Sequence, residues 1–251
     1  MIYDGFTFFN ELDLLEIRLN VLDSVVDKFI LVESDLTFSG KPKDFIFEQN
    51  KDRFAPFLDK IIHIKVQDMP NTDNAWVREA FQRNAIVRGL KDSQSSDKVL
   101  ISDVDEIPNP AAIRKASQLT GVCVFLQNFY YYYLNCIGDE IWKGTRLVSV
   151  GQLTSPQQVR FSANYAIKNA GWHFSYLGGV EAIIKKIDSF SHQEFNSDYF
   201  KDPDRLRQVL ESGGDLFNRS NKWRFVELDE SYPEYILQNI DRYEKLIFQS
   251  S

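Results

Sequence analysis

Runs of consecutive apolar residues alternate with helically spaced apolar residues along the first part of the chain. Four such runs predict buried β-strands, at 5–9, 28–33, 61–66 and 99–102. Leucines at positions 12, 15, 19 and 22 have helical spacing and predict a helix after the first strand. Asn10 is a suitable N-cap for this helix, and Glu11 and Asp13 suit its first turn. Further helices are predicted over 78–90 and from Asn109-Pro110, an N-cap followed by proline at the first helical position.

The order of these elements predicts an α/β fold with a mostly parallel central sheet flanked by helices. Apolar strands without polar alternation are typical of strands that are buried on both faces, and such strands usually pair in parallel. Open sheets of this kind bind ligands at the carboxyl ends of their strands. Glu33 and Asp103 both stand at such ends, so we expect both near a ligand site.

The second half of the chain has a different pattern. Residues 122–134 are strand-like and strongly aromatic, and helices are predicted over 180–190, 205–211 and 233–248. We see no internal repeat, low-complexity segment or long linker. The simplest interpretation is a single domain over residues 1–251, with halves that meet near residue 115.

Composition and charge exclude several classes of protein. With 43% hydrophobic and 26% charged residues, the chain can form a sizeable core. A net charge of −7 without a basic stripe argues against nucleic-acid binding. An anionic substrate would need local arginine, lysine or a metal ion to offset this charge. Cys123 and Cys136 form no CxxC pair, which predicts neither a zinc site nor a disulfide.

Targeting signals are absent from the sequence pattern. The first residues lack a basic segment followed by an apolar one, and no apolar run reaches the ~18 residues of a membrane span. Two thiols in a chain of this length fit a reducing compartment. We therefore expect a cytoplasmic protein without a transmembrane segment.

Three acids, Asp103, Asp105 and Glu106, stand together directly after the apolar run 99–102. In extended backbone, the two aspartates of an Asp-x-Asp pattern point to the same side. They can hold one divalent cation through oxygen and leave positions for diphosphate oxygens and water. Surface acids at a turn are the alternative, because this pattern alone occurs often by chance.

Several separated motifs carry a resemblance to a known family. They are FFNELDLLEIRL, VESDLTFSGKPK, WVREAFQRN, DVDEIP and GWHFSYLGG, in this order between residues 3 and 248. Together they resemble glycosyltransferase family 17, and we expect the chain to differ from the animal members in lacking their membrane anchor and stem. The resemblance implies a GT-A-type fold, a UDP-sugar donor of the UDP-GlcNAc type, a Mn²⁺-like cation (or Mg²⁺) and an inverting transfer. The first half would then bind the nucleotide sugar and the second half the acceptor glycan.

The expected cation site consists of Asp105, helped by Asp103, with His173 as a third ligand from the second half. A histidine in the core is the alternative interpretation of His173, which stands between aromatic residues. His192 is a weaker candidate ligand, and His63 is expected to be structural. Glu106 could support the metal ligands without contacting the ion itself, or it could simply favour the turn.

Several residues could contact the nucleotide diphosphate or the base. Glu33 could contact the base or ribose, or could be a surface acid at a strand end. Arg78 and Arg83 could offset the diphosphate charge, although Glu79 and Arg83 have the spacing of an ordinary helix salt bridge. Lys41 and Lys43 could reach phosphate, and solvated loop lysines are the alternative.

Glu181 is the candidate catalytic base, because it follows a glycine-rich loop able to approach a sugar. Glutamate is also favoured in a first helical turn by the helix dipole, which is the alternative interpretation. Asp188 and Glu194 are the alternative candidates for the catalytic base.

The aromatic run 129–133 could offer stacking surfaces to an acceptor sugar, and strand alternation limits this role to one face. Trp142 and Trp172 have the same two interpretations, acceptor contact or core.

The sequence therefore predicts a metal-dependent inverting glycosyltransferase that moves GlcNAc from UDP-GlcNAc to a sugar hydroxyl. A sugar-nucleotidyltransferase is a second hypothesis, but the chain lacks a glycine-rich basic loop near its first strand. A non-catalytic glycan-binding module is a third, and it would not need the acid cluster.

Overall fold

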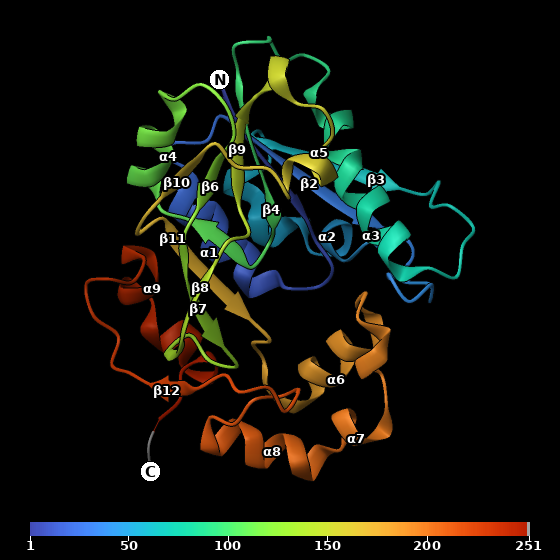
Figure 1. Ribbon diagram of the computed structural model, residues 1–251, viewed down its shortest axis with the longest axis vertical. Coiled ribbons are helices and arrows are strands. Elements are labelled where there is room, and N and C mark those ends of the chain that lie inside the picture. The colour runs from blue at the N-terminus through green and yellow to red at the C-terminus, as the bar shows by residue number, and fades with distance from the viewer. Residues whose placement is uncertain (250–251) are drawn as a thin grey trace.

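The computed structural model describes residues 1–249 and has a mixed α/β fold in which two sheets are flanked by helices (Figure 1). The strands of the first sheet are β1 (Ile2–Thr7), β2 (Lys28–Ser34), β3 (Ile61–Val66), β4 (Lys98–Asp103), β6 (Cys123–Phe125), β9 (Arg146–Ser149) and β10 (Tyr165–Ile167). Their order across the sheet is β10-β6-β9-β4-β1-β2-β3. Strands β4, β1, β2 and β3 are parallel, whereas β9 runs antiparallel to both neighbours. This sheet is therefore mixed, because four of its six strand pairs are parallel and the two pairs made by β9 are antiparallel.

A second sheet, which the sequence pattern did not predict, lies beside the first. Its order is β12-β8-β7-β11-β5, and only β7 and β11 pair in parallel. The strands are β5 (Glu106–Pro108), β7 (Gln127–Tyr131), β8 (Cys136–Trp142), β11 (Gly171–Ser175) and β12 (Trp223–Phe225). The chain crosses between the sheets from β4 to β5 and again from β6 to β7, so the predicted strand 122–134 is divided at Leu126.

The helices largely follow the predicted segments. They are α1 (Leu12–Leu22), α2 (Ile46–Gln49), α3 (Ala75–Asn84), α4 (Pro110–Ser117), α5 (Pro156–Val159), α6 (Gly179–Ser189), α7 (Asp198–Lys201), α8 (Pro203–Ser212) and α9 (Glu234–Gln238). The predicted helix 78–90 consists of α3 and a 3₁₀ segment, Ala85–Leu90. The predicted helix 233–248 divides into α9 and a 3₁₀ segment, Ile240–Leu246.

The two predicted N-caps have different outcomes. Asn109 caps α4 as expected, because its side chain accepts a hydrogen bond from the backbone N–H of Ala111 at 2.8 Å. Asn10 does not cap α1, and that prediction was wrong. The N-cap position belongs to Glu11, whose carboxylate turns back to accept the N–H groups of Phe9 and Asn10. The longer glutamate side chain reaches these donors before the helix begins.

The core lies on both faces of the first sheet, as the apolar strands predicted. Phe29 and Leu31 of β2 pack in the same cluster as Leu15 of α1. Ile30 and Val32, which point the other way, pack with residues of the 3₁₀ segment after α3. Helices α6, α7 and α8 lie together at one end of the molecule (Figure 1). No helix within residues 1–249 has the length and apolar character needed to cross a bilayer.

Candidate active site

The acidic segment 103–106 forms the crossing between the two sheets. Asp103 ends β4, Val104 and Asp105 form a turn, and Glu106 begins β5. Backbone hydrogen bonds tie the turn to both sheets, from Val104 N–H to the Thr7 carbonyl at 3.2 Å and from Phe174 N–H to the Asp105 carbonyl at 2.9 Å. The acids therefore lie at the carboxyl edge of the parallel strands, as the sequence predicted.

Arg18 of α1 holds this turn from inside the protein. Its side chain is fully buried, and Nη1 donates to the carbonyl oxygens of Asp103 at 3.1 Å and Glu106 at 2.8 Å. Nε and Nη2 donate to the carboxylate of Asp4 at 2.8 and 2.6 Å, and Nη2 also reaches Ser102. Sequence reasoning missed Arg18. The signal that could have identified it is a charged residue between Ile17 and Leu19, in a helix that was expected to pack against the sheet.

Two of the three acids face arginines. Asp103 accepts hydrogen bonds from Thr7 Oγ1 at 2.8 Å, Arg83 at 3.0 Å and Arg160 at 2.8 Å. Glu106 is fully buried and accepts from Trp142 Nε1 and Arg160 Nη2, both at 2.6 Å. Burial alone would raise the pKa of Asp103, but the charges of Arg160 and Arg83 hold it well below its usual range. Arg160, which the sequence analysis did not single out, therefore joins the two carboxylates.

Asp105 has different partners. Its Oδ2 lies 3.0 Å from Lys186 Nζ of α6, and its Oδ1 lies 3.5 Å from His173 Nε2 of β11. Burial opposes the charged form of Asp105, but Lys186 and His173 lower its pKa well below the usual range. The structure thus brings together Asp105 and His173, two of the residues predicted to hold a cation.

His173 stacks on two aromatic rings that also pack against each other. Its ring centroid is 4.7 Å from that of Phe129 and 4.4 Å from that of Trp142, and both pairs are stacked. Its Nδ1 is buried without a hydrogen-bond partner among the described residues. The imidazole is therefore fixed by stacking, with one nitrogen directed to Asp105.

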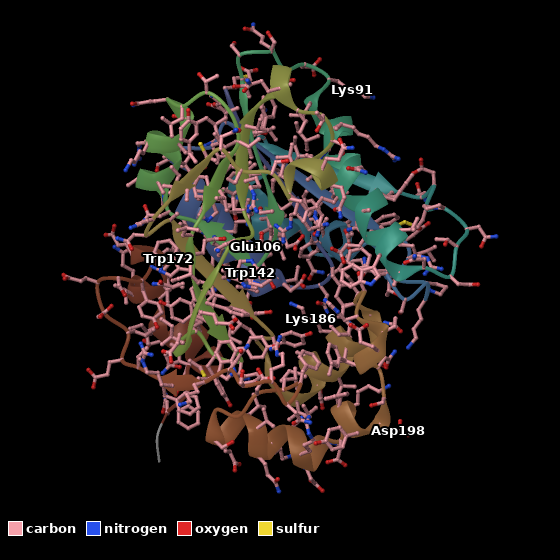
Figure 2. The ribbon with its side chains drawn as sticks, in the orientation of Figure 1. Lys91, Glu106, Trp142, Trp172, Lys186 and Asp198 are labelled. Atoms are coloured by element: carbon pink, nitrogen blue, oxygen red, sulfur yellow. The ribbon has the colours of Figure 1, made fainter. Side chains whose placement is uncertain are left out.

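A cavity of about 530 Å³ opens at this turn. Figure 2 shows Glu106, Trp142 and Lys186 near the centre of the molecule, and the last two of these residues line the cavity. Its lining includes four acids, Glu11, Glu79, Asp103 and Asp105, and seven lysines and arginines, Lys43, Lys143, Lys186, Arg83, Arg146, Arg160 and Arg219. The cavity is therefore locally basic in a chain of net charge −7, which provides the offset that an anionic ligand would need.

Other predicted contact residues lie away from the cavity. Glu33 is fully buried, and its carboxylate accepts from Lys43 Nζ at 2.9 Å and the Ile46 N–H at 2.5 Å. His63 also contacts Glu33, at 3.2 Å, which agrees with a structural role for this histidine. Arg78 donates to the carbonyl oxygens of Phe38 and Thr72, so it fixes loops. Glu33 and Arg78 are not among the residues that line the cavity.

The carboxylates predicted to act as a base are also placed elsewhere. Glu181 is exposed in the first turn of α6 and does not line the cavity. It is five residues before Lys186, roughly 140° away around the helix, so the two side chains face different directions. Asp188 pairs with Lys201 at 2.8 Å, and the exposed Glu194 pairs with His192. Of these residues, His192 and Lys186 line the cavity.

The aromatic run divides between two faces, as strand alternation predicted. Phe129 and Tyr131 line the cavity, whereas Tyr130 packs against Phe174 and Tyr232 on the other side of the sheet. The two tryptophans divide in the same way. Trp142 lines the cavity, and Trp172 lines a different pocket.

An acidic turn at the carboxyl edge of parallel strands, opening into a basic cavity, is typical of a site for an anionic small molecule. The chain belongs to glycosyltransferase family 17, whose family model matches residues 1–247. The resemblance seen in the sequence is therefore confirmed.

Curated relatives carry the name β-1,4-mannosyl-glycoprotein 4-β-N-acetylglucosaminyltransferase. The chain is 23% identical to that of Homo sapiens and 22% identical to those of Rattus norvegicus and Mus musculus. Each match covers 95% of this chain and 53% of the relative, so the chain spans about half the length of these relatives. A solved structure, the inositol-1-phosphate CTP transferase from T. maritima, matches 99% of this chain and 97% of its own with 10% identity. Its TM-score of 0.34 is too low to assign a fold.

Proposed function

We propose that this chain is a metal-dependent, inverting glycosyltransferase of GT-A type. It would transfer GlcNAc from UDP-GlcNAc to a sugar hydroxyl of an acceptor glycan. The observation that carries the proposal is the acidic turn 103–106, which opens into a cavity lined by Lys186, Arg83 and Arg160. These charges suit a nucleotide diphosphate, and the family and its named relatives support a sugar donor.

The cation would be held by Asp105 and His173. The residues that the structure describes contain no cluster of three or more His, Cys, Asp or Glu arranged for a metal. Sites for Mg²⁺ and similar ions commonly use one or two protein ligands and take the rest from substrate phosphates and water. The pair fits such a site, because its facing atoms are 3.5 Å apart and His173 has no other polar partner among the described residues. A bound cation would neutralise charge on the departing diphosphate.

Asp103 has a different part in this proposal. Its carboxylate is held by Arg83, Arg160 and Thr7, so its oxygens are already engaged by the protein. Asp103 therefore fixes the two arginines at the cavity wall, where they can face phosphate oxygens. Asp105 pairs with Lys186 through Oδ2, and its Oδ1, which faces His173, is the oxygen of the motif that could be directed towards a cation.

Titration calorimetry with UDP is the direct test of this site. We expect Mn²⁺ to strengthen UDP binding by at least about tenfold, since a cation held by Asp105 and His173 would offset the charge of the diphosphate. The variant His173→Asn should lose most of this gain, whereas Asn196→Ala, outside the cavity lining, should keep it. UDP affinity that is the same with Mn²⁺ and with a chelator, or no binding at all, would contradict the proposed cation site.

We propose Glu11 as the catalytic base, in place of the exposed Glu181. Among the four acids that line the cavity, Asp103, Asp105 and Glu79 are each paired with a lysine or arginine. Such pairing favours the ionised carboxylate and makes it a poorer proton acceptor. Glu11 has no such salt bridge within residues 1–249, and its carboxylate accepts from the backbone N–H groups of Phe9 and Asn10, both through Oε2. Its other oxygen is free to accept a proton from an acceptor hydroxyl.

Two isosteric variants compare the candidate bases. Glu11→Gln should lower kcat about 100-fold or more, because general-base catalysis contributes roughly 10²–10⁴. Its affinity for UDP should stay unchanged. Glu181→Gln should retain nearly full kcat, since this side chain is exposed outside the cavity. The reverse result, with kcat lost only in Glu181→Gln, would return the role to the residue first predicted from the sequence.

The cavity also offers aromatic surface for an acceptor sugar. Trp76 and Phe161 line it and are 47% and 80% exposed, respectively. Large exposed aromatic side chains beside a polar cavity provide flat apolar faces for sugar rings. We therefore propose that the acceptor sugar contacts Trp76 and Phe161.

A further inference from the structure

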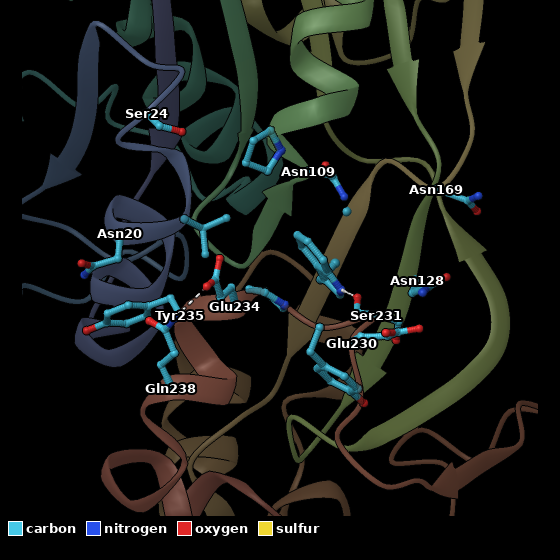
Figure 3. Close-up of a pocket in the computed structure, with 16 residues that line it drawn as sticks. Asn20, Ser24, Asn109, Asn128, Asn169, Glu230, Ser231, Glu234, Tyr235 and Gln238 are labelled. Carbon is cyan, nitrogen blue, oxygen red and sulfur yellow. Dashed lines mark hydrogen bonds between the residues drawn. The ribbon is translucent and has the colours of Figure 1, made fainter.

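A second pocket, of about 780 Å³, lies between α1, α9 and the second sheet (Figure 3). Asn20 comes from α1, Gln238 from α9 and Asn128 from β7, so segments distant in the sequence meet around it. Its volume falls within the range of small-molecule sites, about 300–1,000 Å³. Neither the family nor the names of the relatives refer to this pocket.

The second sheet separates this pocket from the candidate active site. In β7 and β11, Asn128 pairs with Trp172 and Phe129 pairs with His173. Successive strand residues point to opposite faces of a sheet. Phe129 and His173 line the active-site cavity, whereas Asn128 and Trp172 line the second pocket. The two pockets are therefore on opposite faces of the same two strands, and a ligand in one does not touch the other.

Side-chain amides dominate the polar lining of the second pocket. They belong to Asn20, Asn109, Asn128, Asn169 and Gln238. An amide offers both donors and an acceptor, which matches hydroxyl groups that also do both. Asn109 uses its oxygen for the Ala111 N–H, and Asn20 uses its nitrogen for the Glu16 carbonyl, so each keeps the other half of its amide for a ligand.

The charge of the lining selects against anions. Glu230 and Glu234 line the pocket, and none of the described residues that form it is lysine, arginine or histidine. Phosphates, nucleotides and acidic sugars would meet uncompensated repulsion there. Tyr235, which is partly exposed on the α9 side, adds an aromatic surface that can pack against the carbon face of a sugar ring.

We propose that this pocket binds a neutral oligosaccharide, at a site distinct from the place of transfer. The pocket offers side-chain amides that both donate and accept hydrogen bonds, an aromatic surface, and no lysine, arginine or histidine among the described residues that line it. These features fit uncharged polyhydroxylated ligands better than ligands that carry phosphate. The proposal goes beyond the proposed transfer reaction, because it concerns binding on the other face of the sheet and needs no donor or metal. A glycan held there would keep the chain close to glycan-bearing molecules.

Saturation-transfer NMR on the full chain, without UDP or metal, tests this site with three probes. Mannotriose and N,N′-diacetylchitobiose are the neutral probes, and sialyllactose is the acidic one. We expect at least one neutral probe to bind and sialyllactose to bind at least about fivefold more weakly. Equal or tighter binding of sialyllactose, or no binding of either neutral probe, would overturn the proposal.

The double variant Asn128→Ala/Gln238→Ala locates the binding. It should weaken binding of the neutral probe at least about fivefold, because each lost hydrogen bond contributes modestly. Gln208→Ala, an exposed glutamine of α8 that lines neither pocket, should leave the affinity unchanged. UDP binding should be unaltered in the double variant. A failure of the sugar-binding proposal can therefore be distinguished from a failure of the proposed transferase activity. Unchanged sugar affinity in the double variant would place the ligand elsewhere and refute the proposal.

Discussion

Replacement of Asp105 by asparagine is expected to lower turnover on the order of 10³-fold or more while the fold is retained. Asparagine has the same shape but no negative charge, so it holds a cation much more weakly. Under the proposed mechanism, loss of the cation would remove several kcal/mol of charge stabilisation from the departing diphosphate, and each ~1.4 kcal/mol corresponds to tenfold in rate. Lys186 would remain as the nearest positive charge at this position, so some activity should persist.

The measurement is release of UDP from UDP-GlcNAc, with and without an acceptor glycan, in the presence of Mn²⁺. Slow hydrolysis of the donor needs no knowledge of the acceptor, so it is the more general assay. Asp198→Asn is a matched control, because Asp198 is exposed on α7, away from the cavity (Figure 2). Thermal unfolding of both variants excludes a loss of structure. If Asp105→Asn turned over the donor as fast as the unchanged protein, Asp105 would not hold the cation.

The position of the acidic turn could be predicted from the sequence because its determinants are local. A continuous apolar run before Asp103 indicated a buried strand, and Asn109-Pro110 indicated the next helix. The short strand β5 between them escaped prediction. It is three residues long and pairs with β11, about 65 positions later in the chain. Periodicity over so few residues carries no information, and the partner strand decides whether they form a strand.

Two arginines of the site, Arg18 and Arg160, escaped prediction for a related reason. Arg160 lies in a turn after α5, where a charged residue normally faces solvent, yet it contacts Asp103 and Glu106 across more than fifty positions. Only the tertiary fold brings these groups together. Glu181 illustrates the converse case. Its helix was predicted correctly, but the face of α6 that meets the cavity depends on packing against α7 and α8, which sequence spacing does not reveal.

Arg18→Met should give the largest loss of stability, about 3–5 kcal/mol. The substitution keeps an apolar stem but leaves the fully buried carboxylate of Asp4 without its partner. Removing one member of a buried ion pair costs about this much, because the remaining charge is uncompensated. The carbonyl oxygens of Asp103 and Glu106 would also lose their donor. Urea unfolding of the variant and the unchanged protein measures the difference.

A second substitution separates stability from positioning. In Arg18→Met/Asp4→Leu both charges are replaced by apolar side chains, so most of the lost stability should return, since such replacements of buried pairs are often nearly neutral. The turn 103–106 would still lack the guanidinium that holds its carbonyl oxygens. We therefore expect UDP release by the double variant to stay at least about tenfold below that of the unchanged protein, because misplacement of about 1 Å at a reacting centre is costly. If the double variant recovered both stability and turnover, Arg18 would serve the fold alone, and the acidic turn would hold its geometry without it.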